Sequence, residues 1–198
     1  MVMQSKYYQF VNSFSPISED SFEKLTQIST FQKIKANTPV VTVGQVPQYV
    51  YLLSSGIMRA YMIAEDGKQH NKKLFSGLSC VGPLTALIKN SPSELIYETI
   101  TDCNTYEINF IEFRKLCREH FELGRLYVKI LEYIFIEYEQ RNLDLMSLNA
   151  TERYLKLQRQ IPDIDSLIPQ FQIASYLGVT TVQLSRIRKK IKSAKVLT

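Results

Sequence analysis

Residues 170–191 read QFQIASYLGVTTVQLSRIRKKI. This stretch predicts two short helices that meet at a turn on Gly178, because glycine adopts a positive φ without steric cost. Ala174 supplies the small residue that lets the first helix cross the second. Apolar residues recur at helical spacing through both halves and predict a buried seam. They are Ile173, Leu177, Val179, Leu184, Ile187 and Ile191. The pattern is typical of a helix-turn-helix.

The start of the second helix is marked by Thr180 and, three residues later, Gln183. This spacing predicts a capping box, in which the threonine hydroxyl accepts the Gln183 N–H and the glutamine side chain accepts the Thr180 N–H. We therefore expect the second helix to begin at about Thr181.

The second helix is expected to present a basic face opposite its apolar stripe. A rotation of about 100° per residue places Val182, Arg186 and Lys189 there. Arg186 could read a guanine edge, Val182 could contact a thymine methyl, and the lysines could meet phosphates. The residues expected to contact DNA are Thr180, Thr181, Val182, Ser185, Arg186, Lys189 and Lys190. A basic, solvated face on an ordinary helical hairpin is the alternative.

The charge of the chain is concentrated in its last segment. Residues 149–198 contain nine Lys/Arg and three Asp/Glu, a net +6, whereas the whole chain carries +5 and residues 1–148 therefore carry −1. A near-neutral body with a basic end is typical of a DNA-binding domain joined to a domain with another task.

Composition excludes several other classes of protein. The sequence has no apolar run of about 18 residues and no signal-peptide pattern, so we expect a soluble, cytoplasmic protein without membrane contact. Cys80, Cys103 and Cys117 are scattered, and His70 and His120 lie far apart, so no metal site, cofactor or catalytic site is expected.

The body of the chain predicts a β-domain followed by helices. Short strand-like runs alternate with turn residues between Lys33 and Ile108, and Asp66-Gly67 predicts a hairpin. These runs favour an antiparallel β-roll of the jelly-roll type. Ahead of them, residues 18–25 read as a short capped helix, and residues 110–120 form another short helix. Residues 123–148 predict a helix of about 25 residues that is apolar around much of its circumference, which favours burial on two sides. We expect one side to pack on the roll and the other on the same helix of a second subunit.

The order of these elements resembles that of the Crp/Fnr family, transcription regulators with a cyclic-nucleotide-binding-like sensor domain. The resemblance also rests on the run Ala150-Thr151-Glu152-Arg153-Tyr154, on residues 173–178 and 184–190, and on the turns at Gly44, Gly56 and Asp66-Gly67. It implies an α+β chain with a cupin-like β-roll at residues 1–120, a dimerisation helix at 121–148 and a helix-turn-helix domain at 149–198. Asn149 would lie at the hinge. The implied partners are double-stranded DNA, a second copy of the chain and RNA polymerase.

The cyclic-nucleotide cassette of that family does not carry over. Family members that bind cyclic AMP present a Gly-Glu pair to the ribose and an Arg-Ser/Thr pair to the phosphate. Here Gly82 is followed by Pro83, and Ser93 and Glu94 stand where the arginine and its neighbour are expected. Without the cation a cyclic phosphate lacks its partner, so we expect no useful affinity for cyclic AMP. The effector is not identified by the sequence.

The family's other sensor chemistries and its C-terminal wing are also weakly represented. An iron–sulfur sensor needs four cysteines, and the chain has three. Only about six residues follow Lys192, so the winged-helix-like domain is expected to have a short or absent wing. The preferred function is a homodimeric regulator that binds a pseudo-palindromic operator. The alternatives are a degenerate sensor or adaptor of the same fold that acts through protein partners, and, less favoured, a cupin-like metalloenzyme.

Overall fold

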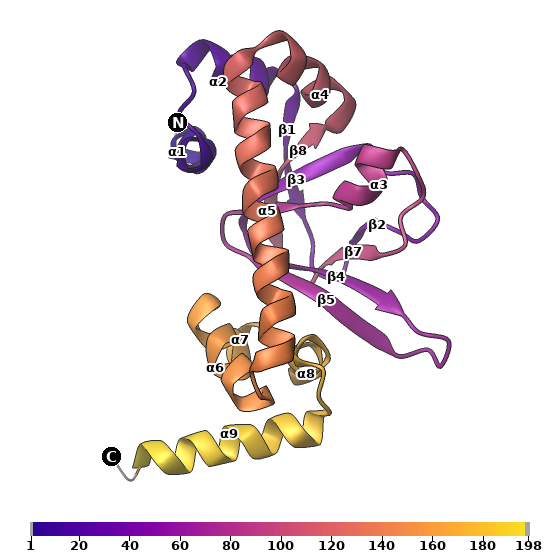
Figure 1. Cartoon of the computed structure of the whole chain (residues 1–198), viewed down its shortest axis with the longest axis vertical. Coiled ribbons are helices and arrows are strands. Elements are labelled where there is room, and N and C mark those ends of the chain that lie inside the picture. Colours follow the sequence, from indigo (N-terminus) through magenta and orange to yellow (C-terminus); the bar gives the residue numbers. More distant parts are fainter. Residues whose placement is uncertain (1, 197–198) are drawn as a thin grey trace.

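A computed structural model describes the backbone of residues 2–196 and the side chains of residues 7–193. Two four-stranded antiparallel sheets form the β-roll (Figure 1). The first sheet has the order β1-β8-β3-β6, with β1 at Ser29–Ile34, β8 at Cys103–Asn109, β3 at Tyr49–Ser55 and β6 at Ser79–Val81. The second has the order β2-β7-β4-β5, with β2 at Pro39–Val41, β7 at Ile96–Thr99, β4 at Ile57–Ile63 and β5 at Gln69–Ser76. The α+β class and the roll predicted from the sequence are confirmed.

The predicted hairpin joins β4 to β5 through Asp66 and Gly67. Gly67 has a φ of 80°, and the Asp66 carboxylate accepts the Lys68 N–H at 3.0 Å. The space between the two sheets is filled by apolar side chains, mainly Tyr51, Met58, Phe75 and Tyr97.

A second core lies between the first sheet and a group of helices. These are α1 at Val2–Phe14, α2 at Glu19–Gln27, α4 at Phe110–Glu119 and α5 at Phe121–Ser147, while α3 at Leu84–Lys89 lies in the cassette region. Ser18 caps α2 as expected. The sequence analysis did not foresee α1, although Tyr7, Phe10, Val11 and Phe14 follow the spacing of a buried helical face.

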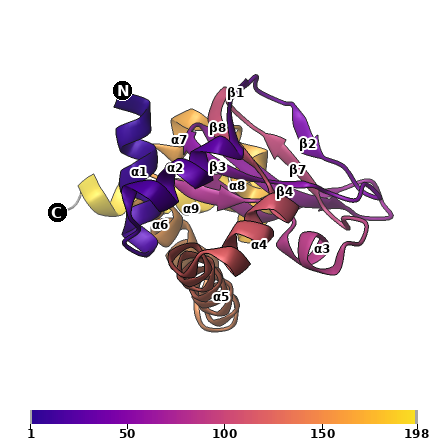
Figure 2. The same cartoon turned by 90° about the horizontal axis from the view of Figure 1, so that it is seen from above.

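The long helix α5 contains 27 residues and is about 40 Å long at 1.5 Å per residue. Viewed along its axis, it lies at one edge of the molecule, with the other elements on one side of it (Figure 2). It carries the chain from the roll to the C-terminal helices (Figure 1).

The C-terminal helices form a third core. They are α6 at Ala150–Gln160, α7 at Ile164–Leu167, α8 at Gln170–Leu177 and α9 at Thr181–Val196. Its fully buried members include Ile164, Ile173, Leu177 and Leu184. Helix α9 lies at the far end of the molecule from α2 and α4 (Figure 1).

Candidate nucleic-acid interface

Helices α8 and α9 meet at the turn predicted from the sequence. Gly178 is left-handed, with a φ of 69°, and its N–H donates to the carbonyls of Ala174 and Ser175. Ala174 is buried, as a crossing residue must be. The capping box is also present: Gln183 N–H donates to Thr180 Oγ1 at 3.1 Å, and Thr180 N–H donates to Gln183 Oε1 at 2.8 Å. The two helices are therefore held in a defined turn by local interactions alone.

Helix α9 has one buried side and one open side. Leu184 is fully buried, and Ile187 and Ile191 are half-buried against the C-terminal core. All seven residues expected to contact DNA are exposed: Thr180, Thr181, Val182, Ser185, Arg186, Lys189 and Lys190. Their shared exposure leaves a basic surface that a polyanion can reach.

Arg188 lies away from this open surface. Its guanidinium pairs with the Asp165 carboxylate, and its Nε donates to the Tyr154 hydroxyl at 3.2 Å. Burial and the nearby Asp165 raise the pKa of Tyr154 to about 12, although Arg188 opposes this shift. Arg188 therefore fastens α9 to α6 and α7.

No strand follows α9 within residues 2–196, and the helix continues to Val196. The expectation of a short wing falls partly on residues 197–198, which lie outside the described residues.

The junction between α5 and α6 lies where the resemblance placed the hinge. Asn149 caps α6 with a capping box: its side chain accepts the N–H groups of Thr151 and Glu152, and the Glu152 carboxylate accepts the Asn149 N–H. Arg153 donates to the carbonyls of Leu148 and Leu177. The chain direction thus changes at one well-capped residue.

The cassette region lacks a cation. Gly82 precedes Pro83, which stands at the N-cap of α3, and the buried Ser93 donates its hydroxyl to the Leu95 carbonyl. Glu94 is exposed, so its carboxylate does not occupy the place of the missing arginine.

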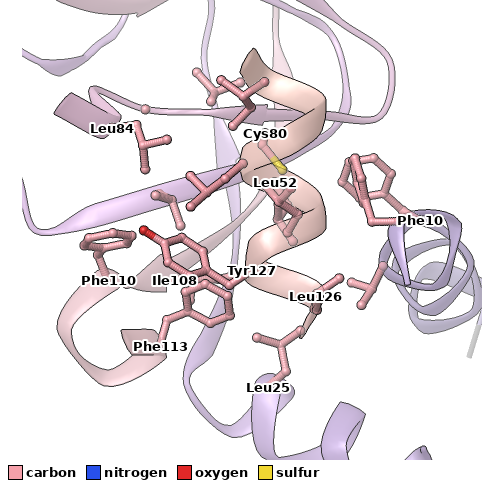
Figure 3. A pocket seen from close by; sticks show the side chains of 18 residues that line it. Phe10, Leu25, Leu52, Cys80, Leu84, Ile108, Phe110, Phe113, Leu126 and Tyr127 are labelled. Atoms are coloured by element: carbon pink, nitrogen blue, oxygen red, sulfur yellow. The ribbon is translucent and has the colours of Figure 1, made fainter. Parts of the chain in front are cut away.

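A small cavity beside the cassette is apolar. It has a volume of about 70 Å³ and lies between the first sheet, α1 and α5. Figure 3 shows Phe10, Leu52, Cys80 and Tyr127 around it. No Lys or Arg lines this cavity, so it offers no partner for a phosphate.

The sequence analysis missed the contact between the roll and α8, which centres on the buried side chain of Arg59. Its guanidinium donates to Glu98 Oε2 at 2.6 and 2.8 Å and to Gln172 Oε1 of α8 at 2.9 Å. Asn71 Nδ2 also donates to Gln172 Oε1, at 2.7 Å. These partners are up to 113 residues apart in the chain, so no local pattern reveals them.

A further contact joins α8 to strand β5. The Ser175 hydroxyl donates to the Gln69 carbonyl at 2.8 Å and accepts the Asn71 N–H at 2.9 Å. Strand β5 is an edge strand of its sheet. In this arrangement the DNA-binding helices are docked on the roll.

The described residues were also searched for metal sites and membrane spans. They contain no group of three or more His, Cys, Asp or Glu side chains placed to hold a metal ion. Cys103 is buried, and Cys80 and Cys117 are half-buried. Among residues 2–196, no helix is long and apolar enough to cross a bilayer.

Comparison with known proteins identifies the domains. Residues 31–120 match the cyclic nucleotide-binding domain family. The chain is 26% identical over 118 residues to the anaerobic regulatory protein of Bacillus subtilis (strain 168), which covers 60% of this chain and 48% of that protein. The match therefore spans about half the length of that relative.

Solved structures share the fold of nearly the whole chain. The c-di-GMP-responsive global regulator CLP of Xanthomonas campestris is 17% identical with a TM-score of 0.68, over 90% of this chain and 93% of CLP. FixK2 of Bradyrhizobium japonicum is 17% identical with a TM-score of 0.70, over 85% of this chain and 86% of FixK2. With its sensor-type domain, its long helix and its C-terminal helix-turn-helix, the chain belongs to the Crp/Fnr family.

Proposed function

We propose that the protein is a transcription regulator that binds DNA as a homodimer through α9. The observation that carries this proposal is the exposed basic surface of α9, held by the Gly178 turn and the Thr180–Gln183 capping box. A helix of this kind fits the major groove, where Arg186 can donate to both guanine O6 and N7. RNA polymerase is the further partner that family membership suggests.

The dimer is supported by an unpartnered apolar face on α5. Phe121, Val128 and Phe135 follow each other at intervals of seven residues, and Ile136 and Leu143 repeat that interval beside them. All five are exposed, with Phe135 at 65%. The opposite face of α5 packs on the roll, so this one is free to pair with a second copy and set two α9 helices about 34 Å apart on DNA.

The DNA-binding proposal is tested by selecting bound sequences from genomic DNA and measuring affinity for the enriched sequence. We expect Arg186→Ala to weaken binding by roughly ten- to a hundredfold and to relax the preference at one base pair. Arg118→Ala, which removes an exposed arginine from α4, is the matched control and should bind like the wild type. Full affinity and specificity in Arg186→Ala would contradict the role of that residue.

The salt dependence of the wild-type protein distinguishes the regulator from the adaptor that uses the same fold. A protein that neutralises several phosphates loses about three orders of magnitude or more in DNA affinity between roughly 50 and 200 mM salt. Weak, salt-insensitive binding would instead favour an adaptor that acts through protein partners.

The dimer is tested by sedimentation of Phe135→Asp. A carboxylate in the centre of the apolar face should shift the protein to monomers, because it would be buried without a partner. Phe171→Asp is the matched control, since Phe171 is also exposed (53%) but lies on α8. Dimers that persist in Phe135→Asp would exclude this face as the interface.

We also propose that cyclic AMP is not the effector. The apolar cavity beside Gly82 and the absence of a cation in the cassette support this view. Calorimetric titration should detect no binding at micromolar cyclic AMP, and a measured isotherm in that range would overturn the proposal.

A further inference from the structure

A second and larger cavity lies where the three parts of the chain meet. Its volume is about 300 Å³, and its walls come from β5, β6, α5 and α6, with Tyr176 of α8 at one side. In Figure 1, this is the region where α5 passes β5 and reaches α6 and α8. We call it the junction cavity. Its volume lies at the lower end of the range of small-molecule sites, about 300–1,000 Å³.

The lining of the junction cavity is strongly basic. Five cationic side chains contribute to it: Lys72, Lys73, Arg141, Arg153 and Lys156. Two carboxylates, Glu137 and Asp144, also line it, so the formal charge of the walls is +3. Like charges gathered around one space repel each other, and an anion bound between them removes that repulsion.

Only two of these cations have a carboxylate partner. Lys156 Nζ lies 2.6 Å from Asp144 Oδ2, and Lys73 Nζ lies 3.8 Å from Glu137 Oε2. Among the described side chains, no carboxylate lies within 4.0 Å of the charged groups of Lys72, Arg141 or Arg153. Burial also lowers the pKa of Lys73, although Glu137 opposes that shift.

Arg153 provides an unused donor at the cavity. Its Nη atoms bind the carbonyls of Leu148 and Leu177, but its Nε is buried and has no hydrogen-bond partner among the described residues. A buried donor without an acceptor costs about 1–3 kcal/mol, and an anion could supply the acceptor.

Aromatic rings line the same space. Lys72 and Lys73 lie over the ring of Tyr138, with Nζ 4.9 and 5.4 Å from its centroid, and the Arg141 guanidinium lies 4.0 Å from the centroid of Tyr176. Cations and flat rings together suit a ligand that joins a phosphate to a planar group.

We propose that the junction cavity is a binding site for a phosphate-bearing small molecule, held by Lys72, Lys73 and Arg153. The site is separate from the cassette, whose neighbouring cavity is apolar. It faces the side of α5 that carries Glu137, Arg141 and Asp144, whereas the proposed dimer face carries Val128 and Phe135. A second copy on the dimer face would therefore leave the site open.

The location of the site makes the ligand an effector. A bound phosphate would contact β5 of the roll and α6 of the C-terminal domain at once, and would therefore stabilise one orientation of the two. This regulatory role rests on the proposed function. Ligand binding itself does not, because the titration below contains no DNA.

A purely structural role explains only part of the cluster. Arg141 and Arg153 donate to the carbonyls of Tyr176 and Leu177 and so help to end α8. Lys72 and Lys73 do not take part in that contact, and they therefore provide the test.

The experiment is calorimetric titration of the full chain with inorganic pyrophosphate and, separately, with ADP. We expect both to bind, with ADP tighter if its base uses the rings. Lys72→Gln/Lys73→Gln should weaken both by at least about tenfold, the ratio that 1.4 kcal/mol produces. Lys72→Arg/Lys73→Arg, which keeps the charge, should retain binding and shows that the position tolerates substitution.

Lys189→Gln/Lys190→Gln is the matched control, because it removes two lysines from the open surface of α9. It should bind pyrophosphate and ADP like the wild type. Failure of the wild-type protein to bind either compound would overturn the proposal. Equal weakening in the two Lys→Gln pairs would also overturn it, since that result would mean general attraction of anions to a basic protein.

Discussion

Glycines with positive φ differ in what surrounds them. At Gly56, with a φ of 96°, an added Cβ would lie 2.5 Å from the Asp102 carbonyl oxygen and 2.6 Å from Cys103 Sγ. At Gly178, with a φ of 69°, it would meet nothing within 4 Å. Backbone strain alone applies at Gly178, whereas Gly56 must also accommodate a clash with the adjoining backbone.

We therefore expect Gly56→Ala to lower the free energy of unfolding by about 3 kcal/mol or more, and Gly178→Ala by about 1–2 kcal/mol. Urea denaturation of both variants checks the difference, with Gly67→Ala as the control because its added Cβ also meets open space. Equal losses at positions 56 and 178 would show that the clash is relieved by movement of the neighbouring strand.

Single residues were predictable where their partners are close in sequence. Thr180 and Gln183 are three residues apart, and their bonds match the prediction. Glu122 could not be predicted in the same way: it accepts hydrogen bonds from Ser18 and Ser21, more than 100 residues away. These bonds lower the pKa of Glu122 to about 2.

At the level of elements, the capping box of α9 has a measurable consequence. Thr180→Ala removes the hydroxyl that accepts the Gln183 N–H and should destabilise the C-terminal domain by about 1 kcal/mol. Thr181→Ala, one residue later and also exposed, should have little effect. Thermal unfolding followed by circular dichroism compares the two, and an equal loss in both would argue against the cap.

Helices and strands with a clear period were predicted, and those without one were not. The long helix was expected at residues 123–148 and occupies Phe121–Ser147. Helix α7 has only four residues, too few to show a helical period. The first helix, α1, carries a regular apolar face, but Gln4, Ser5 and Lys6 obscure its beginning. Periodicity therefore identified the elements of the helix-turn-helix and the dimer helix, but not the helix that covers them.

For the whole molecule, the polar contact around Arg59 connects the sensor domain with the DNA-binding helices. Gln172→Ala removes the oxygen that accepts from both Arg59 and Asn71. The loss should weaken docking of α8 on the roll by about 1–3 kcal/mol, because two buried donors lose an acceptor. Amide hydrogen exchange at Asn71, whose N–H donates to Ser175, should accelerate by roughly tenfold or more.

Gln170→Ala is the matched control on the same helix, since its side chain bonds only to the Thr181 carbonyl within the C-terminal domain. It should leave exchange at Asn71 unchanged. An unaltered rate in Gln172→Ala would mean that Ser175 alone holds the two parts together.

The hydroxyl of Ser175 takes the place of a neighbouring strand at the border of the second sheet. It accepts one backbone N–H and donates to one backbone carbonyl of β5, and thus occupies groups that another β-strand would otherwise bind. Any movement that lifts α8 from the roll uncovers these groups. The activated form of the protein is consequently also the form most exposed to strand-to-strand aggregation, and occupancy by DNA does not protect that border.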